Sequence, residues 1–335
     1  MENKTPNFLE KVKGFFKGLS KKQLIAIIAA IVVVAVLVPV IILLATPAKK
    51  DYTLVVVTDS AIDNKNKVSN HVLALVTDAD GKIVAARLDS VEMTPALDAE
   101  GKVVAQDSVK TKVEQGDSYG GGTAEKPAME AGSWAKQAKA FEDYIIGKTA
   151  DEVANLDLSL VAGCTMQSTT PLFKALVAKA FASELKVSFS TADAITLGVA
   201  INSKVAAGRN ENATVSSDFA GVVMADGKVV ATMLDSCEQS FTIVEGALVA
   251  PETAAVSKND QGDSYGGGTA EKPAMDAGSW AKQAQAFANS TVGKTVAELA
   301  DLELVSDALA AAGCTMKNTT GGYKTTIIAA AGYAR

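Results

Sequence analysis

The chain is poor in the side chains that most enzymes use for catalysis and metal binding. Its 335 residues include one histidine, His71, and three cysteines, Cys164, Cys237 and Cys314. A structural zinc site needs about four histidine or cysteine ligands, and a nucleophilic triad needs a histidine beside a serine or cysteine. We therefore expect no metal site and no catalytic residues. Because three cysteines cannot all pair within one chain, we interpret them as buried free thiols.

Aromatic residues are also scarce, at 5% of the sequence, and the charge is spread unevenly. Residues 1–22 carry six lysines against two glutamates, whereas residues 51–335 carry 24 basic and 36 acidic side chains. Nucleic-acid binding depends on neutralising phosphates with a basic surface. A body with a net charge of −12 is therefore not expected to bind nucleic acid.

One long apolar run lies near the N-terminus. Residues 23–45 contain no charged side chain, and about 20 apolar residues are enough to cross a bilayer as a helix. The lysines precede this run, and lysine-rich flanks are typically cytoplasmic. The sequence therefore predicts a cytoplasmic tail over 1–22, a single transmembrane helix over 23–45 and an extracytoplasmic remainder held at the cell membrane. Residues 46–48 form a weak cleavage pattern, so removal of the anchor is an alternative.

The remainder of the chain is a tandem duplication. Three segments occur twice with identical sequences: 115–129 with 261–275, 131–138 with 277–284, and 162–166 with 312–316. A period near 146 residues is too long for a solenoid repeat and is the size of one globular core. We therefore predict two homologous domains, over 52–183 and 193–335, each with a core of its own and a polar boundary between them.

The first part of each repeat has the pattern of an antiparallel sheet. In repeat one, residues 52–58 form an expected strand, 72–77 and 82–88 flank an Asp-Gly turn as a hairpin, and 92–106 contain a second expected hairpin. In repeat two, the first hairpin recurs over 221–234. Short turns join antiparallel neighbours, whereas parallel strands need long crossovers. An antiparallel meander is therefore predicted in each repeat.

The second part of each repeat has helical periodicity. Apolar residues recur at helical spacing from Trp134 and from Trp280. Thr149 opens a capping box in repeat one, and the same pattern follows in repeat two. A further helix is predicted over 171–184, with Thr170 as its N-cap. Strands followed by helices make each repeat an α+β domain.

A glycine-rich loop is the first candidate ligand site. The sequence Gly-Asp-Ser-Tyr-Gly-Gly-Gly occurs at 116–122 and again at 262–268. Adjacent glycines let backbone N–H groups approach an anion closely. The alternative is a flexible connection between strand and helix. The candidate cofactor-binding residues of the two loops are Gly120, Gly121, Gly122, Gly266, Gly267 and Gly268.

The single tryptophan of each repeat is the second candidate. Trp134 and Trp280 would be able to stack on the flat ring of a ligand. Their helical spacing with Phe141 and Phe287 instead favours positions in the core.

The third candidate is the repeated Ala-Gly-Cys-Thr-Met segment. Thr165 and Thr315 are expected near a helix N-terminus, where free N–H groups and the helix dipole favour a phosphate. Gly163 and Gly313 would provide the tight turn before each threonine. The alternative is a turn that starts a helix, with a capping threonine and a small buried cysteine.

In this order of elements the sequence resembles the FMN-binding domain family. The shared features are a meandering sheet, an Asp-Gly-Lys hairpin, a glycine-rich loop, an aromatic helix, a Gly-Lys-Thr turn and the Gly-Cys-Thr segment. The family occurs in membrane-anchored subunits of ion-pumping redox complexes and in extracytoplasmic flavoproteins. Its typical motif is Ser/Thr-Gly-Ala-Thr followed by Ser or Thr, and FMN is linked through its phosphate to the final threonine. The resemblance implies that Thr165 and Thr315 are FMN attachment residues.

The motif departs from the family at two positions in each repeat. Ala162 and Ala312 replace the usual Ser or Thr, and Cys164 and Cys314 replace the usual Ala. FMN held without a covalent bond is therefore an alternative to covalent attachment.

Two functions follow from these observations. The first is a membrane-anchored, extracytoplasmic FMN-binding protein that carries electrons to or from a redox partner and is not itself an enzyme. The alternative is a non-enzymatic structural or interaction protein of the cell surface, with domains that are FMN-binding-like but degenerate.

Overall fold

The computed structural model describes residues 19–23, 25–27, 29–31, 48–122, 128–166, 169–208, 212–268, 275, 277–316 and 319–335. The chain divides into two units, Met1–Ala48 and Lys49–Arg335. No helix among the described residues is long and apolar enough to span a membrane. Most of the predicted tail over 1–22, and residues 32–45 of the predicted transmembrane helix, lie outside the described residues. The anchor therefore stays a prediction.

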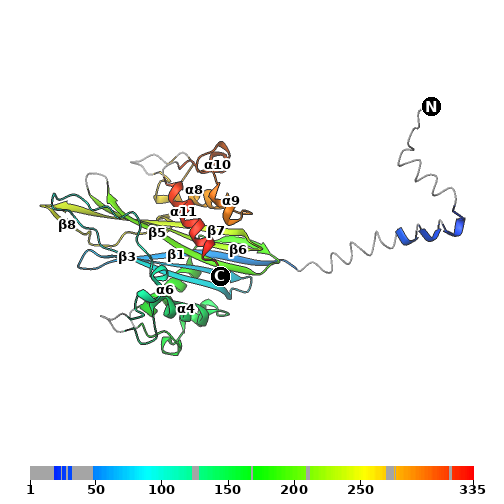
Figure 1. Cartoon of the computed structure of the whole chain (residues 1–335), viewed down its shortest axis with the longest axis horizontal. Coiled ribbons are helices and arrows are strands. Elements are labelled where there is room, and N and C mark those ends of the chain that lie inside the picture. Colours follow the sequence, from blue (N-terminus) through cyan, green and yellow to red (C-terminus); the bar gives the residue numbers. More distant parts are fainter. Residues whose placement is uncertain are drawn as a thin grey trace. The chain divides into compact units, whose positions relative to one another are not determined.

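The second unit contains two four-stranded antiparallel sheets, one from each repeat (Figure 1). The first has the order β3-β2-β1-β4, with strands β1 (Lys50–Ile62), β2 (Val68–Asp78), β3 (Ile83–Met93) and β4 (Val187–Thr191). The second has the order β5-β6-β7-β8, with strands β5 (Ile195–Ala207), β6 (Ala213–Ala225), β7 (Lys228–Val244) and β8 (Ala247–Val249). The predicted antiparallel meander is confirmed in both repeats.

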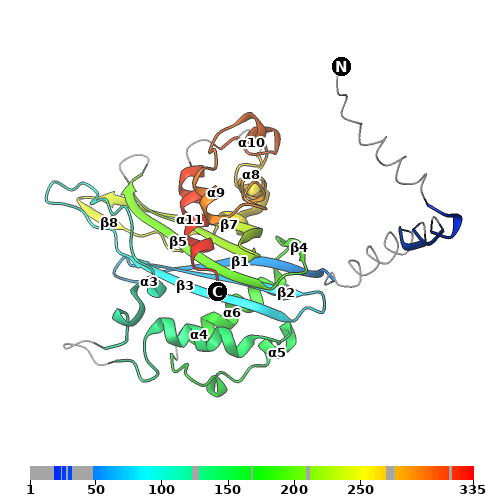
Figure 2. The same ribbon diagram turned by 45° about the vertical axis from the view of Figure 1, so that its right-hand side comes forward.

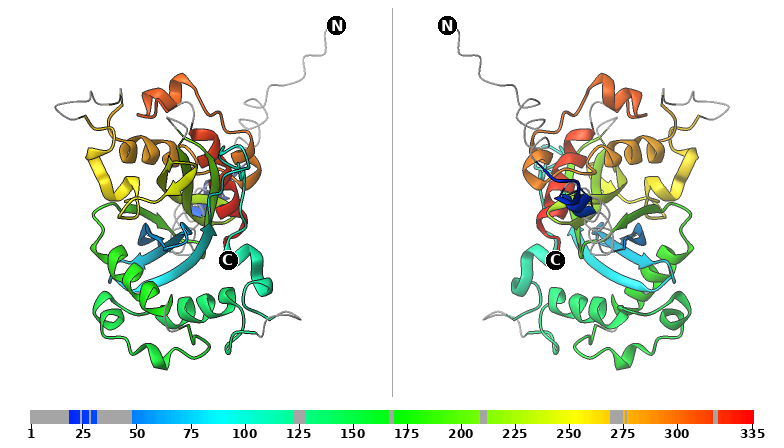
Figure 3. Two further views of the ribbon diagram at one scale, coloured as in Figure 1. Left: turned by 90° about the vertical axis from the view of Figure 1, so that its left-hand side faces the viewer. Right: turned by 90° about the vertical axis from the view of Figure 1, so that its right-hand side faces the viewer.

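Helices cover the outer face of each sheet, so the second unit has four layers: helices, sheet, sheet, helices (Figures 2 and 3). This confirms the α+β class. The helices of repeat one are α3 (Lys112–Gln115), α4 (Trp134–Ile145), α5 (Ala150–Ala154) and α6 (Thr169–Ala182). The helices of repeat two are α7 (Lys258–Gln261), α8 (Trp280–Asn289), α9 (Val296–Ala300), α10 (Asp307–Ala311) and α11 (Thr320–Gly332). Short 3-10 turns are η1 (Gly116–Ser118), η2 (Leu158–Leu160) and η4 (Gly262–Ser264).

The two sheets pack face to face and share one hydrophobic core. Buried side chains from both sheets, among them Leu54 and Val72 from the first and Leu197 and Phe219 from the second, form a single cluster. Each repeat adds a second cluster between its own sheet and its own helices. Each repeat thus has a core cluster of its own, and the two repeats also share a third cluster between their sheets. They share it because the central strands are apolar on both faces, as the buried run Val72–Val76 shows.

The segment predicted as the boundary between the repeats is itself part of the sheet. Residues Val187–Thr191 form β4, which pairs antiparallel with the start of β1. This strand extends the sheet of repeat one before the chain enters β5 of repeat two.

The predicted second hairpin over 92–106 is present only around its turn. β3 ends at Met93, but the Asp98 N–H donates to the Lys102 carbonyl at 2.8 Å, the Val104 N–H donates to the Ala96 carbonyl at 2.9 Å, and Leu97 forms an antiparallel bridge with Val103. Gln106 instead exchanges backbone hydrogen bonds of 2.8 and 2.9 Å with Val205 of β5. The segment therefore keeps short-range pairing at the turn and pairs with the other repeat at its end.

The helix starts are predicted with mixed success. Both capping boxes are present, at Thr149 and at Thr295, with the paired glutamates closing back on the threonine backbone. The helix predicted from residue 171 begins at Thr169. Thr170 therefore lies inside α6, where its hydroxyl donates to the Met166 carbonyl at 2.7 Å, and it is not the N-cap.

Candidate functional site

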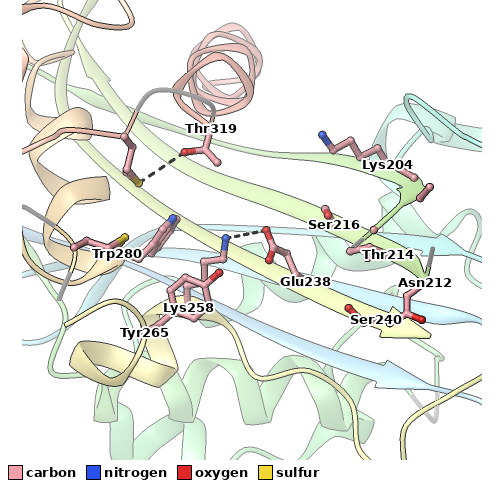
Figure 4. Close-up of a pocket in the computed structure, with 15 residues that line it drawn as sticks. Lys204, Asn212, Thr214, Ser216, Glu238, Ser240, Lys258, Tyr265, Trp280 and Thr319 are labelled. Atoms are coloured by element: carbon pink, nitrogen blue, oxygen red, sulfur yellow. Dashed lines mark hydrogen bonds and ion pairs between the residues drawn. The ribbon is translucent and has the colours of Figure 1, made fainter. Parts of the chain in front are cut away.

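The outer face of the second sheet carries an open cleft of about 850 Å³ (Figure 4). Its sheet side is formed by Lys204, Thr214, Ser216 and Glu238, and its helix side includes Tyr265, Trp280 and Met316. The volume lies within the range of about 300–1,000 Å³ that is usual for small-molecule sites. Its volume and its mixed polar and aromatic lining make the cleft a candidate ligand site.

Strand alternation explains why this wall of the cleft is polar. Along β6 the residues Thr214, Ser216 and Asp218 alternate with the fully buried Val215 and Phe219. Successive side chains of a strand point to opposite faces. The apolar set therefore fills the shared core, and the polar set faces the helices and the cleft.

A buried lysine lies at the centre of the cleft wall. Lys258, at the start of α7, is 5% exposed at its side chain, and its Nζ lies 3.0 Å from Glu238 Oε1. Its Nζ also lies 5.0 Å from the ring centre of Tyr265 and 5.4 Å from that of Trp280. Burial opposes the charged amine, but the oxygens of Tyr323, Glu238 and Tyr265 outweigh it, so the pKa of Lys258 is raised. The side chain is therefore a stable cation with an aromatic lining.

The same cluster occurs in repeat one. Lys112 Nζ lies 2.7 Å from Glu92 Oε1, 4.7 Å from the ring centre of Tyr119 and 5.6 Å from that of Trp134. These lysines and glutamates belong to no recognised sequence motif. A signal was present, because each pair recurs at the repeat period although its neighbours have diverged.

The residue packed beneath the tryptophan, here called the floor of the cluster, is more polar in repeat two, where it is Tyr323, than in repeat one, where it is Phe173. Trp280 Nε1 donates to the Tyr323 hydroxyl at 2.8 Å. In repeat one, Phe173 lies edge-on to Trp134 in the same way, with ring centres 5.6 Å apart. Trp134 Nε1 is buried and has no hydrogen-bond partner among the described residues. Both tryptophans are 2% exposed, which confirms their predicted core positions, and Trp280 also lines the cleft.

Two titratable side chains lie beside this floor at equivalent strand positions. Asp218 pairs in register with Ser236, and His71 pairs with Ser90, the serine that corresponds in repeat one. Burial raises the pKa of Asp218 to about 6. Burial, with the nearby Lys112, lowers the pKa of His71 to about 4, so the imidazole is neutral at pH 7.

A buried aspartate in each repeat organises the backbone around the lysine. Asp89 accepts hydrogen bonds from the backbone N–H groups of Ser90 and Val113, at 2.7 and 3.1 Å. Asp235 accepts from the corresponding groups of repeat two and also from Thr58 Oγ1 at 3.0 Å. Burial raises the pKa of Asp89 to about 7 and that of Asp235 to about 6. These contacts assign both carboxyls to positioning the short helices α3 and α7.

The predicted glycine loops are filled by their own residues. A Cβ atom on Gly120 would overlap the Met129 side chain, and one on Gly121 would overlap the Asp117 carbonyl oxygen. The Gly120 carbonyl accepts from the Met129 N–H at 2.8 Å, and the same contacts recur in repeat two. The loop glycines are therefore required by packing within the loop. None of them lines the cleft, which is instead lined by Tyr265 of the same segment.

The predicted attachment threonines are bonded to a buried glutamine. The backbone N–H and the hydroxyl of Thr165 both donate to Gln137 Oε1, at 2.8 and 3.3 Å. Thr315 makes the same two bonds to Gln283, at 2.9 and 3.1 Å. The helices α6 and α11 begin several residues later, at Thr169 and Thr320. Both threonine N–H groups are thus already occupied, and neither threonine lines the cleft.

The remaining residues of these segments have structural roles. Gly163 and Gly313 have φ values of 80° and 98°, the left-handed conformation of a tight turn. All three cysteines are free and buried, as predicted. In repeat one the Cys164 thiol lies 3.1 Å from the Thr170 hydroxyl.

No family model, curated protein or solved structure matches this chain. Within the described residues, no group of three or more His, Cys, Asp or Glu side chains is arranged to hold a metal ion. The cleft combines lysine amines, hydroxyls, aromatic rings and thioethers. Such a set of side chains is suited to a ligand with an anionic end and a flat apolar end.

Proposed function

We propose that this chain is a membrane-anchored, extracytoplasmic electron carrier that holds FMN without a covalent bond in the cleft of repeat two. One observation carries the proposal. Tyr265 from the glycine-rich segment, Trp280 from the aromatic helix and Met316 from the Gly-Cys-Thr segment come from separate parts of the repeat and meet at one cleft that also contains Lys258. These are the segments on which the resemblance to FMN-binding domains rests.

The side chains of the cleft fit the two ends of FMN. Lys204 and Lys258 would bind the phosphate through charge-assisted hydrogen bonds, and Ser216 would add a hydroxyl donor. The thioether of Met316 and the half-buried ring of Tyr265 would contact the flat ring system. The bound flavin would supply the redox chemistry, and the protein would supply orientation and shielding from water.

Non-covalent binding is preferred because the attachment threonines are occupied. The hydroxyls of Thr165 and Thr315 each donate their proton to a glutamine side-chain oxygen. Among the described residues neither has a titratable base as its hydrogen-bond partner, so those residues do not activate either hydroxyl for attack on a phosphate.

A titration with two ligands tests this proposal. The purified full chain in detergent should bind FMN, and the bound FMN should quench the tryptophan fluorescence of the protein. Riboflavin, which lacks the phosphate, should bind with an affinity lower by about tenfold or more. Lys204→Gln should weaken FMN binding and leave riboflavin binding unchanged, because it removes a charge from the phosphate end only. Exposed Lys65, in repeat one, provides the matched control as Lys65→Gln. A folded chain that binds neither ligand would contradict the proposal.

The structural or interaction protein remains the second candidate. It is favoured by the glycine loops, whose identity between repeats is accounted for by contacts within each loop. A folded, colourless chain of the mass expected from its sequence, with no affinity for added FMN, would support this candidate over the first.

A further inference from the structure

The duplication places two versions of one lysine–glutamate cluster on the outer faces of the two sheets. Ser69 pairs with Glu92 in repeat one, and Ser216 pairs with Glu238 in repeat two. Two positions before these serines stand Lys67, which directly precedes β2, and Thr214 of β6. Lys67 reaches the same face of its sheet, because its Nζ lies 3.5 Å from Glu92 Oε2. Lys67 in repeat one is therefore the structural counterpart of Thr214 in repeat two.

The cluster of repeat one is closed by its own side chains. Glu92 Oε1 binds Lys112 at 2.7 Å, and Glu92 Oε2 lies 3.5 Å from Lys67 Nζ and 3.2 Å from the Tyr119 hydroxyl. Both carboxylate oxygens are thus engaged, and the side chain is 25% exposed. Burial alone would raise the pKa of Glu92. The hydrogen bond from Lys112 and the positive charges of Lys112 and Lys67 outweigh burial, so the pKa of Glu92 is below its ordinary value. Lys67 Nζ thus lies against Glu92 Oε2, from the position that Thr214 occupies in repeat two.

The cluster of repeat two is open at the same place. Thr214 lines the cleft and ends at its short hydroxyl, so no cationic stem extends from this position toward Glu238. The Glu238 side chain is 44% exposed, and Lys258 lies at the cleft wall (Figure 4). Repeat one therefore has a long cationic side chain, Lys67, and a closed cluster. Repeat two has a short hydroxyl side chain, Thr214, at the same position and an open cluster.

We propose that position 67/214 decides which copy of the duplicated site is open: Lys67 closes the site of repeat one, and Thr214 leaves that of repeat two accessible. The identity of the ligand rests on the proposed function. Each chain then binds one anionic aromatic ligand, and the ligand binds in repeat two. The side chain at this position is a specificity determinant of the site and takes no part in redox chemistry.

The two tryptophans provide a reporter for each site. Trp134→Phe leaves Trp280 to report on repeat two, and Trp280→Phe leaves Trp134 to report on repeat one. In the wild-type background, FMN should quench Trp280 with a stoichiometry of one and should not quench Trp134. Thr214→Lys should weaken binding about tenfold or more. Lys67→Thr should add a weaker second site that quenches Trp134, because Ala61 stands in repeat one where Lys204 stands in repeat two. The double exchange should keep one site and move the quenching from Trp280 to Trp134.

Two control variants separate this effect from a general change of charge. Lys65→Thr removes a lysine from the same turn, where its side chain is exposed. Thr242→Lys adds one at an exposed position of β7 outside the cleft. Both should bind FMN as the wild type does. An unchanged stoichiometry in Lys67→Thr together with unchanged affinity in Thr214→Lys would overturn the proposal.

A measurement without FMN distinguishes this proposal from the proposed function. A water-soluble carbodiimide, which labels accessible carboxylates, should label Glu238, 44% exposed, faster than Glu92, 25% exposed. Lys67→Thr should speed the labelling of Glu92, and Thr214→Lys should slow that of Glu238, as measured by peptide mass spectrometry. If labelling follows this pattern and no variant binds FMN, the open and closed sites stand and the flavin assignment is wrong. If FMN binds but the exchanges alter neither readout, the gating role of position 67/214 is wrong.

Discussion

At the scale of single residues, the two repeats act as an internal comparison. The lysine, glutamate, tyrosine and tryptophan of each cluster are retained, whereas the residues beneath and in front of them have changed. Phe173 corresponds to Tyr323, and the ring geometry is nearly the same: the tryptophan ring centres lie 5.6 and 5.8 Å away, at 86° and 84°. Only the hydroxyl differs. A buried donor without a partner costs about 1–3 kcal/mol.

We therefore expect Phe173→Tyr to stabilise the protein, because the added hydroxyl would accept a hydrogen bond from Trp134 Nε1. The gain in the free energy of unfolding should be about 0.5–1.5 kcal/mol. Tyr323→Phe should lower it by a similar or larger amount, because it leaves Trp280 Nε1 unpaired in the same way. Chemical denaturation of both variants measures the two changes. A loss of stability in Phe173→Tyr would mean that the site in repeat one is too tightly packed to admit the oxygen.

At the scale of elements, α11 shows how tertiary contacts override a weak local signal. Its first turn contains Gly321 and Gly322, which disfavour a helix. The helix forms because Tyr323 and Ile327 are buried against the second sheet. Gly322 has a further role, since a Cβ atom there would lie 2.8 Å from Asp218 Oδ2.

The two glycines give a matched pair of substitutions. Gly321→Ala should stabilise the chain by about 0.5–1 kcal/mol, because alanine favours the helix and its Cβ would meet only Leu304 Cδ1, at 3.7 Å. Gly322→Ala should give no gain or a loss, because the same propensity is offset by the close contact of the new Cβ with half-buried Asp218. Thermal unfolding of the two variants side by side tests this. Equal gains in stability from both substitutions would show that the contact with Asp218 does not restrict the side chain at position 322.

Elements that depend on local sequence were predictable, and contacts between the repeats were not. The strands around the Asp-Gly turns and the capping boxes at Thr149 and Thr295 follow from turn and cap chemistry, which acts over a few residues. The bond from Gln106 to Val205 and the buried position of Lys258 depend on segments far apart in the chain. For the same reason Tyr265, Trp280 and Met316 were recognised separately, whereas their meeting at one cleft was not.

At the scale of the whole molecule, the duplication has produced one folding unit out of two similar halves. The inner faces of both sheets meet in a single cluster, and polar contacts cross it: Asn70 Nδ2 donates to Ser217 Oγ at 2.7 Å, and Thr58 Oγ1 donates to Asp235 at 3.0 Å. Separating the repeats would expose an apolar sheet face to water. At about 25 cal/mol per Å² of apolar surface, this exposure opposes independent folding.

The two repeats should therefore unfold in a single cooperative transition. The single-tryptophan variants Trp134→Phe and Trp280→Phe report on one repeat each, and in each variant the fluorescence melt should coincide with the melt followed by circular dichroism. Phe219→Ala, introduced in both backgrounds, should lower the free energy of unfolding by about 3–5 kcal/mol, because Phe219 is fully buried in the shared core. Both tryptophan reporters should show the same decrease. A chain ending at residue 192 should be molten or insoluble, and adding residues 193–335 as a separate chain should restore its structure. Two resolved transitions, or a shift confined to the Trp280 reporter, would instead mean that the repeats are independent domains that merely touch.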